Sequence, residues 1–186
     1  MKNLSKTDKY WNIFVFITLV LAAGWIVFTS LFFLKEENKA SVAPITGFQA
    51  PDFQLNTEDG QSIRLATLQG KPVILNFWAS WCLPCKSEIP ALEKVHQQYV
   101  DRVVILGVNV TINDHLPVAS RFLQESMITF PVVWDVQGST TSRYGVSALP
   151  TTFFLDRYGR IQNVIIGGPM SEALLIAEVE KLSKVE

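Results

Sequence analysis

Two cysteines separated by two residues follow shortly after an apolar run, and this arrangement constrains the fold more than any other feature. Cys82 and Cys85 are the only cysteines of the 186-residue chain. Residues 73–78 form the nearly continuous apolar run expected of a strand that is covered on both faces. Residues 82–99 carry apolar side chains at helical spacing, so a helix is predicted to begin at the first cysteine. The chain is therefore expected to fold around a strand-to-helix junction that carries both sulfurs.

The position of the two sulfurs indicates thiol chemistry. At a helix N-terminus, unpaired backbone N–H groups and the positive end of the helix dipole stabilise a thiolate. Cys82 is therefore predicted to be the nucleophile. Cys85 lies one helical turn further on and is predicted to resolve a mixed disulfide formed on Cys82.

Other uses of a cysteine pair fit the sequence less well. A structural zinc site needs four ligands, and beyond the two cysteines the chain offers only His96 and His115. A protease-type cysteine paired with a distant histidine does not need a second thiol at this spacing. A peroxide-reducing site usually has a Thr three residues before its cysteine, where this chain has Ala79. A redox dithiol is favoured, and neither a metal nor a cofactor is expected.

The stretch Phe-Trp-Ala-Ser-Trp-Cys-Leu-Pro-Cys-Lys at residues 77–86 resembles the thioredoxin superfamily. With Leu-Pro-Thr-Thr-Phe at residues 149–153 and the apolar N-terminal segment, it is similar to the ResA/TlpA-like membrane-anchored thiol-disulfide oxidoreductases, which have a redoxin domain of the AhpC/TSA type. The resemblance covers about residue 48 to the C-terminus. It implies an enzyme, a thiol-disulfide oxidoreductase of the protein-disulfide reductase type, acting as a monomer.

The resemblance also implies roles for Glu88 and Pro150. From sequence alone, a Glu in the first turns of a helix is favoured by the dipole and is usually solvated. ResA-like proteins carry a Glu at this place near the thiols, and Asn76 stands where thioredoxin has a buried acid, so the resemblance makes Glu88 a proton acceptor for Cys85. Pro150 reads locally as an ordinary trans proline that opens a strand. The resemblance instead implies a cis-proline loop facing the cysteines, in which the Leu149 backbone pairs with a substrate strand.

The predicted fold is α/β and thioredoxin-like, with a mixed central sheet flanked by helices, an N-terminal hairpin and an inserted strand–helix unit, preceded by one transmembrane helix. Asp114 is predicted to cap the helix of the inserted unit, which would end at Ser126. Asp114 and His115 are interpreted as capping and surface residues. Further elements are expected as a hairpin over 52–64, strands over 103–110, 130–134, 151–155 and 161–166, and helices over 140–144 and 171–184.

The N-terminal part predicts a membrane anchor. Residues 11–34 contain no charged side chain and would span about 36 Å as a helix, more than a bilayer core, whereas a signal peptide has a shorter apolar region. The predicted organisation is a cytoplasmic tail (1–10), a transmembrane anchor (11–34), a linker (35–47) and the thioredoxin-like domain (48–186). Three lysines, Lys2, Lys6 and Lys9, precede the span and place the N-terminus in the cytoplasm. The catalytic domain is then expected on the extracytoplasmic side of the cell membrane, held by a single pass.

The predicted function is reduction of protein disulfides outside the cytoplasm. The resemblance implies that the haem-binding cysteines of apocytochrome c are the substrate and that a membrane-embedded thiol protein is the electron donor. A disulfide-forming oxidant and a membrane-tethered binding module with a structural disulfide remain as alternatives. The net charge is −1 and the sequence has no dense stripe of Lys and Arg that could form a basic surface for nucleic acid. No nucleic-acid partner is therefore expected.

Overall fold

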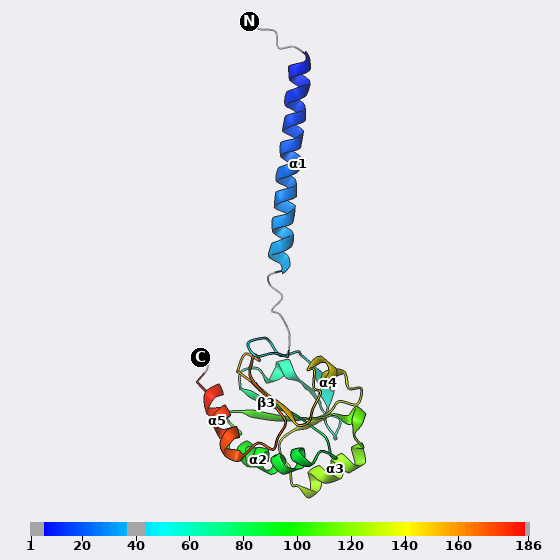
Figure 1. Cartoon of the computed structure of the whole chain (residues 1–186), viewed down its shortest axis with the longest axis vertical. Helices are drawn as coiled ribbons and strands as arrows, with labels where there is room; N and C mark the ends of the chain where they lie inside the picture. The colour runs from blue at the N-terminus through cyan, green and yellow to red at the C-terminus, as the bar shows by residue number, and fades with distance from the viewer. Residues whose placement is uncertain (1–5, 37–43, 185–186) are drawn as a thin grey trace. The chain divides into compact units, whose positions relative to one another are not determined.

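The computed structural model describes residues 6–36 and 44–184 (Figure 1). The chain divides into two compact units, residues 1–40 and 41–186. The described part of the first unit is one helix, α1 (Lys6–Glu36). Residues 1–5 of the predicted tail and residues 37–43 of the predicted linker lie outside the described residues.

Helix α1 covers the whole of the predicted anchor, residues 11–34. Several of its large apolar side chains are exposed, including Trp11, Phe16 and Leu21. Among the residues that the structure describes, however, no helix has both the length and the sustained hydropathy required of a membrane span.

The second unit is built on a seven-stranded mixed sheet in the order β2-β1-β5-β4-β3-β6-β7. β3 pairs in parallel with β4, and β4 with β5, whereas the other neighbouring strands are antiparallel. The predicted mixed α/β fold is confirmed. The strands are β1 (Gln54–Asn56), β2 (Ser62–Arg64), β3 (Val73–Trp78), β4 (Val104–Asn109), β5 (Val132–Trp134), β6 (Thr151–Leu155) and β7 (Ile161–Ile166).

Strand β3 lies between β4 and β6, and all six of its residues are buried. Its side chains alternate between the two faces of the sheet because successive residues of a strand point in opposite directions. Ile74 and Trp78 belong to one apolar core, whereas Leu75 and Phe77 belong to the other. Both faces of β3 are therefore covered, as its continuous apolar sequence predicts.

Helices α2, α3 and α5 contribute to the core on one face of the sheet, and Tyr144, which follows α4, packs into the core on the other face (Figure 1). The helices are α2 (Leu83–Tyr99), α3 (Leu116–Glu125), α4 (Ser139–Arg143) and α5 (Glu172–Leu182), with short 3₁₀ helices η1 (Leu65–Leu68) and η2 (Thr111–Asn113). α2 contains Pro90 and continues through it to Tyr99.

The hairpin of β1 and β2 forms as predicted, and it extends one edge of the sheet because β1 also pairs with β5. One detail differs from the expectations. The predicted cap of α3 is wrong: the N-cap residue is His115, and no side chain caps this helix. The Asp114 carboxylate is instead hydrogen-bonded to the loop that precedes the cysteines.

Candidate active site

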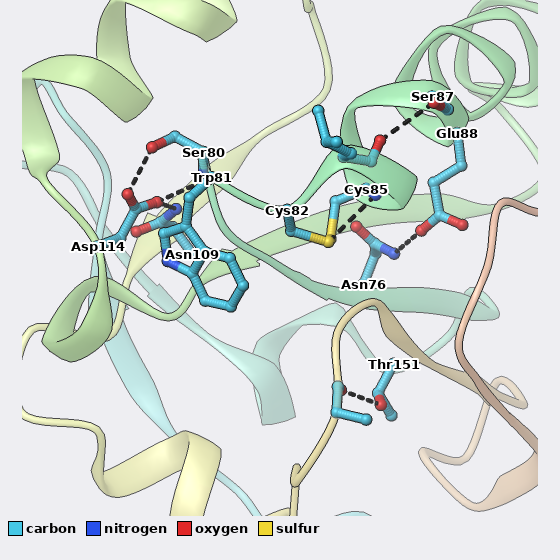
Figure 2. Close-up of a disulfide and its surroundings, with 12 residues drawn as sticks. Asn76, Ser80, Trp81, Cys82, Cys85, Ser87, Glu88, Asn109, Asp114 and Thr151 are labelled. Carbon is cyan, nitrogen blue, oxygen red and sulfur yellow. Dashed lines mark hydrogen bonds between the residues drawn. A yellow bond between two sulfur atoms is a disulfide. The ribbon is translucent and has the colours of Figure 1, made fainter.

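Strand β3 ends at Trp78, and a short loop then leads to Cys82, the N-cap residue of α2. A disulfide joins Cys82 to Cys85 (Figure 2). The Cys82 sulfur also accepts a hydrogen bond of 3.2 Å from the backbone N–H of Cys85. The N-cap position therefore directs a backbone N–H at the Cys82 sulfur, and the same donor would stabilise a thiolate there.

The two sulfurs are shielded while their neighbours are not. Cys82 is 4% exposed and Cys85 is fully buried, whereas Trp81 is 59% and Leu83 is 74% exposed. A second thiol or disulfide can therefore reach only the Cys82 side of the pair. It would do so past two exposed apolar side chains, an indole and a leucine.

Glu88 lies three residues after Cys85 on α2 and is fully buried. Its Oε1 accepts a hydrogen bond of 2.8 Å from the Asn76 amide, and its Oε2 accepts one of 3.0 Å from the backbone N–H of Met170 (Figure 2 shows the first). Burial raises the pKa of the Glu88 carboxyl, and the two hydrogen bonds oppose but do not cancel this effect. The interpretation of Glu88 as a solvated residue is wrong.

Asn76 connects Glu88 to the sheet. It lies on β3 directly opposite Thr152 of β6, and its amide nitrogen also donates a 2.9 Å hydrogen bond to the Thr152 hydroxyl. Both N–H groups of the amide are thus engaged, and this fixes which way the side chain faces. One oxygen of the Glu88 carboxylate is therefore bonded to Asn76 on β3, and the other is bonded to Met170 in the segment before α5.

Pro150 precedes β6, and the peptide bond between Leu149 and Pro150 is cis, as the resemblance implies. The carbonyl of Pro150 accepts a 2.7 Å hydrogen bond from the N–H of Gly167. Thr151 fixes the same loop by donating its hydroxyl to the carbonyl of Ala148 at 2.8 Å (Figure 2). Gly168 lies against both predicted site residues: a Cβ placed there would be 2.6 Å from Glu88 Oε2 and 2.7 Å from Pro150 Cγ. Glu88 and Pro150 therefore belong to one packed region.

A second polar group lies on the other side of the disulfide, around the half-buried Asp114 (Figure 2). Its carboxylate accepts hydrogen bonds from the backbone N–H and the hydroxyl of Ser80 and from the amide of Asn109. Partial burial raises the pKa of Asp114, but the hydrogen bonds from Asn109 and Ser80 outweigh it and hold the pKa below its usual value. Trp81 is tied to the same segment, since its indole N–H donates to the Asn113 carbonyl at 2.8 Å.

Sequence reasoning placed Cys82, Cys85, Glu88 and Pro150 at the site but missed the contacts of Asn76 and Asp114. The sequence did contain a signal that could have placed the Asp114 segment at the site. Asn109 ends β4, which runs parallel to β3 and pairs with it at Trp78. Since ligand and active sites of open α/β sheets lie beyond the carboxyl ends of parallel strands, the polar segment after β4 had to lie beside the segment after β3.

A mixed sheet that delivers a Cys-x-x-Cys pair to the start of a helix, beside a cis-proline loop, defines a thioredoxin-like thiol-disulfide oxidoreductase. Comparison with known families agrees. Residues 46–164 match the AhpC/TSA family, and the chain belongs to this family.

Named relatives and solved structures show the same class. The chain is 37% identical over 152 residues to the thioredoxin-like protein YneN of Bacillus subtilis, covering 81% of this chain and 85% of that protein. It is 35% identical over 170 residues to the thiol-disulfide oxidoreductase ResA of Oceanobacillus iheyensis, covering 88% and 86%. Among solved structures, StoA of Bacillus subtilis aligns with a TM-score of 0.62 at 32% identity, over 69% of this chain and 96% of StoA. A thiol:disulfide interchange protein of Chlorobium tepidum aligns with a TM-score of 0.66 at 32% identity, over 73% and 95%.

Proposed function

We propose that this oxidoreductase is a reductant of protein disulfides, tethered to the cell membrane with its catalytic domain on the extracytoplasmic side. It would take electrons from a membrane-embedded thiol protein and pass them to oxidised protein cysteines, such as the haem-binding pair of apocytochrome c. The observation that carries the proposal is the buried Glu88 carboxyl one helical turn beyond Cys85. It provides an internal proton acceptor for a dithiol.

In the proposed reaction, the Cys82 thiolate attacks one sulfur of a substrate disulfide. A mixed disulfide forms, and the other substrate sulfur leaves as a thiolate and takes up a proton. The Cys85 thiolate then attacks the Cys82 sulfur, which forms the intramolecular disulfide and releases the second substrate thiolate. Two electrons pass to the substrate, and the thiol donor later returns them by the reverse exchange.

Glu88 would accept the proton that Cys85 must lose before its attack. A carboxyl whose pKa is raised by burial holds a proton closer to neutral pH than a solvated one does. The uncharged pair between the cysteines, Leu83 and Pro84, adds no positive charge that would stabilise the thiolate further. A strong oxidant has a stabilised reduced form, so the lack of this stabilisation supports a reducing role for the dithiol.

The loop before β6 would receive the substrate. Leu149 is only half-buried and precedes the buried Pro150. In the proposal, the Leu149 backbone pairs with an extended segment of the substrate and holds its disulfide against Cys82. Trp81 and Leu83 supply the exposed apolar surface on the other flank.

The proposed anchor rests on the sequence. Residues 11–34 carry no charge, and lysines are in excess before this stretch. A tether would raise the effective concentration of the catalytic domain toward a donor in the same membrane. An extracytoplasmic location also fits the chemistry, because disulfides form and persist there.

The direction of electron flow is tested by the reduction potential of the Cys82–Cys85 pair. Equilibration with glutathione or dithiothreitol buffers, followed by alkylation of free thiols, measures it. A reductant is expected near −270 mV, about the value of thioredoxin, and a value near −120 mV would indicate a disulfide-forming oxidant. A protein that reduces no model disulfide after treatment with dithiothreitol would instead support an inert binding module.

The substrate and the donor are tested by trapping. Replacing Cys85 with Ser removes the resolving thiol, so mixed disulfides on Cys82 should accumulate in cells and disappear on reduction. The matched control is the Cys82→Ser/Cys85→Ser double variant, which should trap nothing. Cytochrome c precursors among the trapped proteins would support the proposed substrate, and a polytopic thiol protein would identify the donor. Unrelated abundant proteins alone would count against a dedicated reductase.

A further inference from the structure

The segment between β4 and α3 is hydrogen-bonded to the loop that precedes Cys82. Asp114 was expected to cap α3, yet the N-cap of that helix is His115. Both Asp114 oxygens are used elsewhere. Oδ1 accepts from the Ser80 hydroxyl and from the N–H of His115, and Oδ2 accepts from the Ser80 N–H and the Asn109 amide. The carboxylate thus has four donors, two on each oxygen, which matches its full accepting capacity.

The two bonds from Ser80 fix both the backbone and the side chain of that residue. Ser80 is 4% exposed and lies two residues before Cys82, between β3 and the start of α2. Hydrogen bonds to a charged acceptor are stronger than those between neutral groups. None of the ion pairs found among the described residues includes Asp114, so its charge is compensated by these neutral donors. One carboxylate therefore holds both the backbone and the side chain of a residue in the loop that leads to the reactive sulfur.

The same segment also fixes Trp81. The indole N–H is bonded to the Asn113 carbonyl, while the residue as a whole remains 59% exposed. One edge of the ring is therefore held and much of the rest faces solvent. A fixed aromatic side chain can contact a partner at little cost in conformational entropy. The direction of the Trp81 ring depends on Ser80, which precedes Trp81 in the chain. It also depends on Asn113, which precedes Asp114.

We propose that Asp114 is a positioning residue for the dithiol, which fixes the loop of residues 79–81 and thereby the direction in which Cys82 and Trp81 face an incoming disulfide. This inference rests on the dithiol chemistry of the class and does not depend on the direction of electron flow. It also gives the inserted unit a function. The residues before α3 hold the reactive loop against the end of β4.

A neutral amide cannot reproduce all four contacts of this carboxylate. In an Asp114→Asn variant one oxygen becomes an NH₂ group; at the Oδ2 position it faces two N–H donors, and at the Oδ1 position it faces the N–H of His115 and the Ser80 hydroxyl, which can reverse and accept. At least one hydrogen bond is therefore lost and one donor left unpaired, and the remaining bonds lose the charged acceptor that strengthens them. The loop should then move away from its present position, although the core of the domain is untouched.

The test compares Asp114→Asn with Asp101→Asn, a matched change at an exposed carboxylate outside the site. For the first variant, kcat/KM with a protein disulfide should fall about tenfold or more, the consequence of losing a bond to a charged group. The pH profile of Cys82 alkylation, measured with Cys85 replaced by Ser, should shift. The difference in tryptophan emission between the oxidised and reduced protein should change. Asp101→Asn should match the wild type in all three.

Ser80 provides a second test in case Asp114→Asn does not fold. Ser80→Ala removes the hydroxyl bond but keeps the backbone bond, so it should change the same three quantities by a smaller amount. Ser80→Thr keeps the hydroxyl and should restore them. The proposal is overturned if a folded Asp114→Asn behaves like Asp101→Asn, or if Ser80→Ala has the alkylation profile, emission change and kcat/KM of the wild type.

Discussion

The Asn76 amide donates a 2.8 Å hydrogen bond to Oε1 of Glu88, and neither side chain is more than 1% exposed. This contact joins the strand that delivers the cysteines to the helix that contains Cys85. It leaves a carboxyl group buried in the domain with only neutral hydrogen-bond partners, Asn76 and the N–H of Met170. Its ionised form is therefore disfavoured, which has consequences for stability that can be measured.

The first prediction concerns Glu88→Gln in the oxidised protein, in which no thiol titrates. Because burial raises the pKa of Glu88 in the folded state, the folded protein binds more protons than the unfolded protein between the two pKa values. The stability that Glu88 contributes is fully present below the unfolded pKa of about 4.3 and is lost as the pH rises through the folded pKa. Over that range the free energy of unfolding falls by at most about 1.4 kcal/mol per pH unit. The free energy of unfolding of the wild type, relative to Glu88→Gln, should fall over this range.

Urea unfolding at a series of pH values measures this difference. Glu125→Gln is the matched control, because Glu125 is exposed on the last turn of α3. Its free energy of unfolding should stay parallel to that of the wild type. A Glu88→Gln curve that is also parallel to the wild type would mean that Glu88 titrates like a solvated carboxyl, and its proposed role as proton acceptor would lose its support.

The second prediction concerns the nucleophile. With Cys85 replaced by Ser, alkylation of Cys82 by iodoacetamide should have a midpoint below the usual thiol pKa of about 8.5, because Cys82 is the N-cap of α2. The same variant unfolded in guanidinium chloride is the control and should titrate near the usual value. Equal midpoints for the folded and unfolded protein would remove the claim of an activated thiolate.

The third prediction concerns the proposed anchor. Replacing Leu21 and Trp25 together with Lys would place two charges near the middle of residues 11–34, at a cost of about 2.5–3.5 kcal/mol each in a membrane. The wild-type chain should stay with the membrane fraction through alkaline carbonate extraction, and the Leu21→Lys/Trp25→Lys variant should be released. Leu21→Ala/Trp25→Ala is the control and should stay bound. Release of the wild type would contradict the anchor.

Local sequence patterns predicted the elements because they depend on neighbours along the chain. The continuous apolar run gave a strand whose observed bounds are Val73–Trp78, and the helical spacing gave α2. The same spacing contained a further signal. Glu88 falls between Cys85 and Leu92 on the buried stripe of α2, so its helical position favoured burial although its residue type favoured solvent.

The contacts that define the site could not be predicted in this way, because they join distant parts of the chain. Met170 is 82 residues from Glu88, and Asp114 is 34 residues from Ser80. Polar residues after a strand or before a helix are compatible with many partners. An acid before a helix is most often a cap, and only the parallel pairing of β3 and β4 brings Asp114 to the reactive loop.

The last prediction tests whether Glu88 and Pro150 form one packed region around Gly168. A Cβ at this glycine would lie 2.6 Å from Glu88 Oε2 and 2.7 Å from Pro150 Cγ. No positive φ is required there, so Gly168→Ala creates a steric conflict without backbone strain. The proline ring is rigid, and the carboxylate is held by two hydrogen bonds. We expect the substitution to lower the free energy of unfolding by about 1–3 kcal/mol, a typical cost of overpacking.

A double-mutant cycle with Glu88→Ala separates the two contacts. In the Glu88→Ala background the conflict with the carboxylate is gone and only the conflict with Pro150 remains, so Gly168→Ala should cost less than it does in the wild type. The difference is the coupling between positions 88 and 168, about 0.5 kcal/mol or more for residues in contact. Urea unfolding of the four proteins measures it. Equal costs in both backgrounds would show that the side chain at position 88 does not contact Gly168, and that the segment before α5 does not hold the carboxylate against the proline loop.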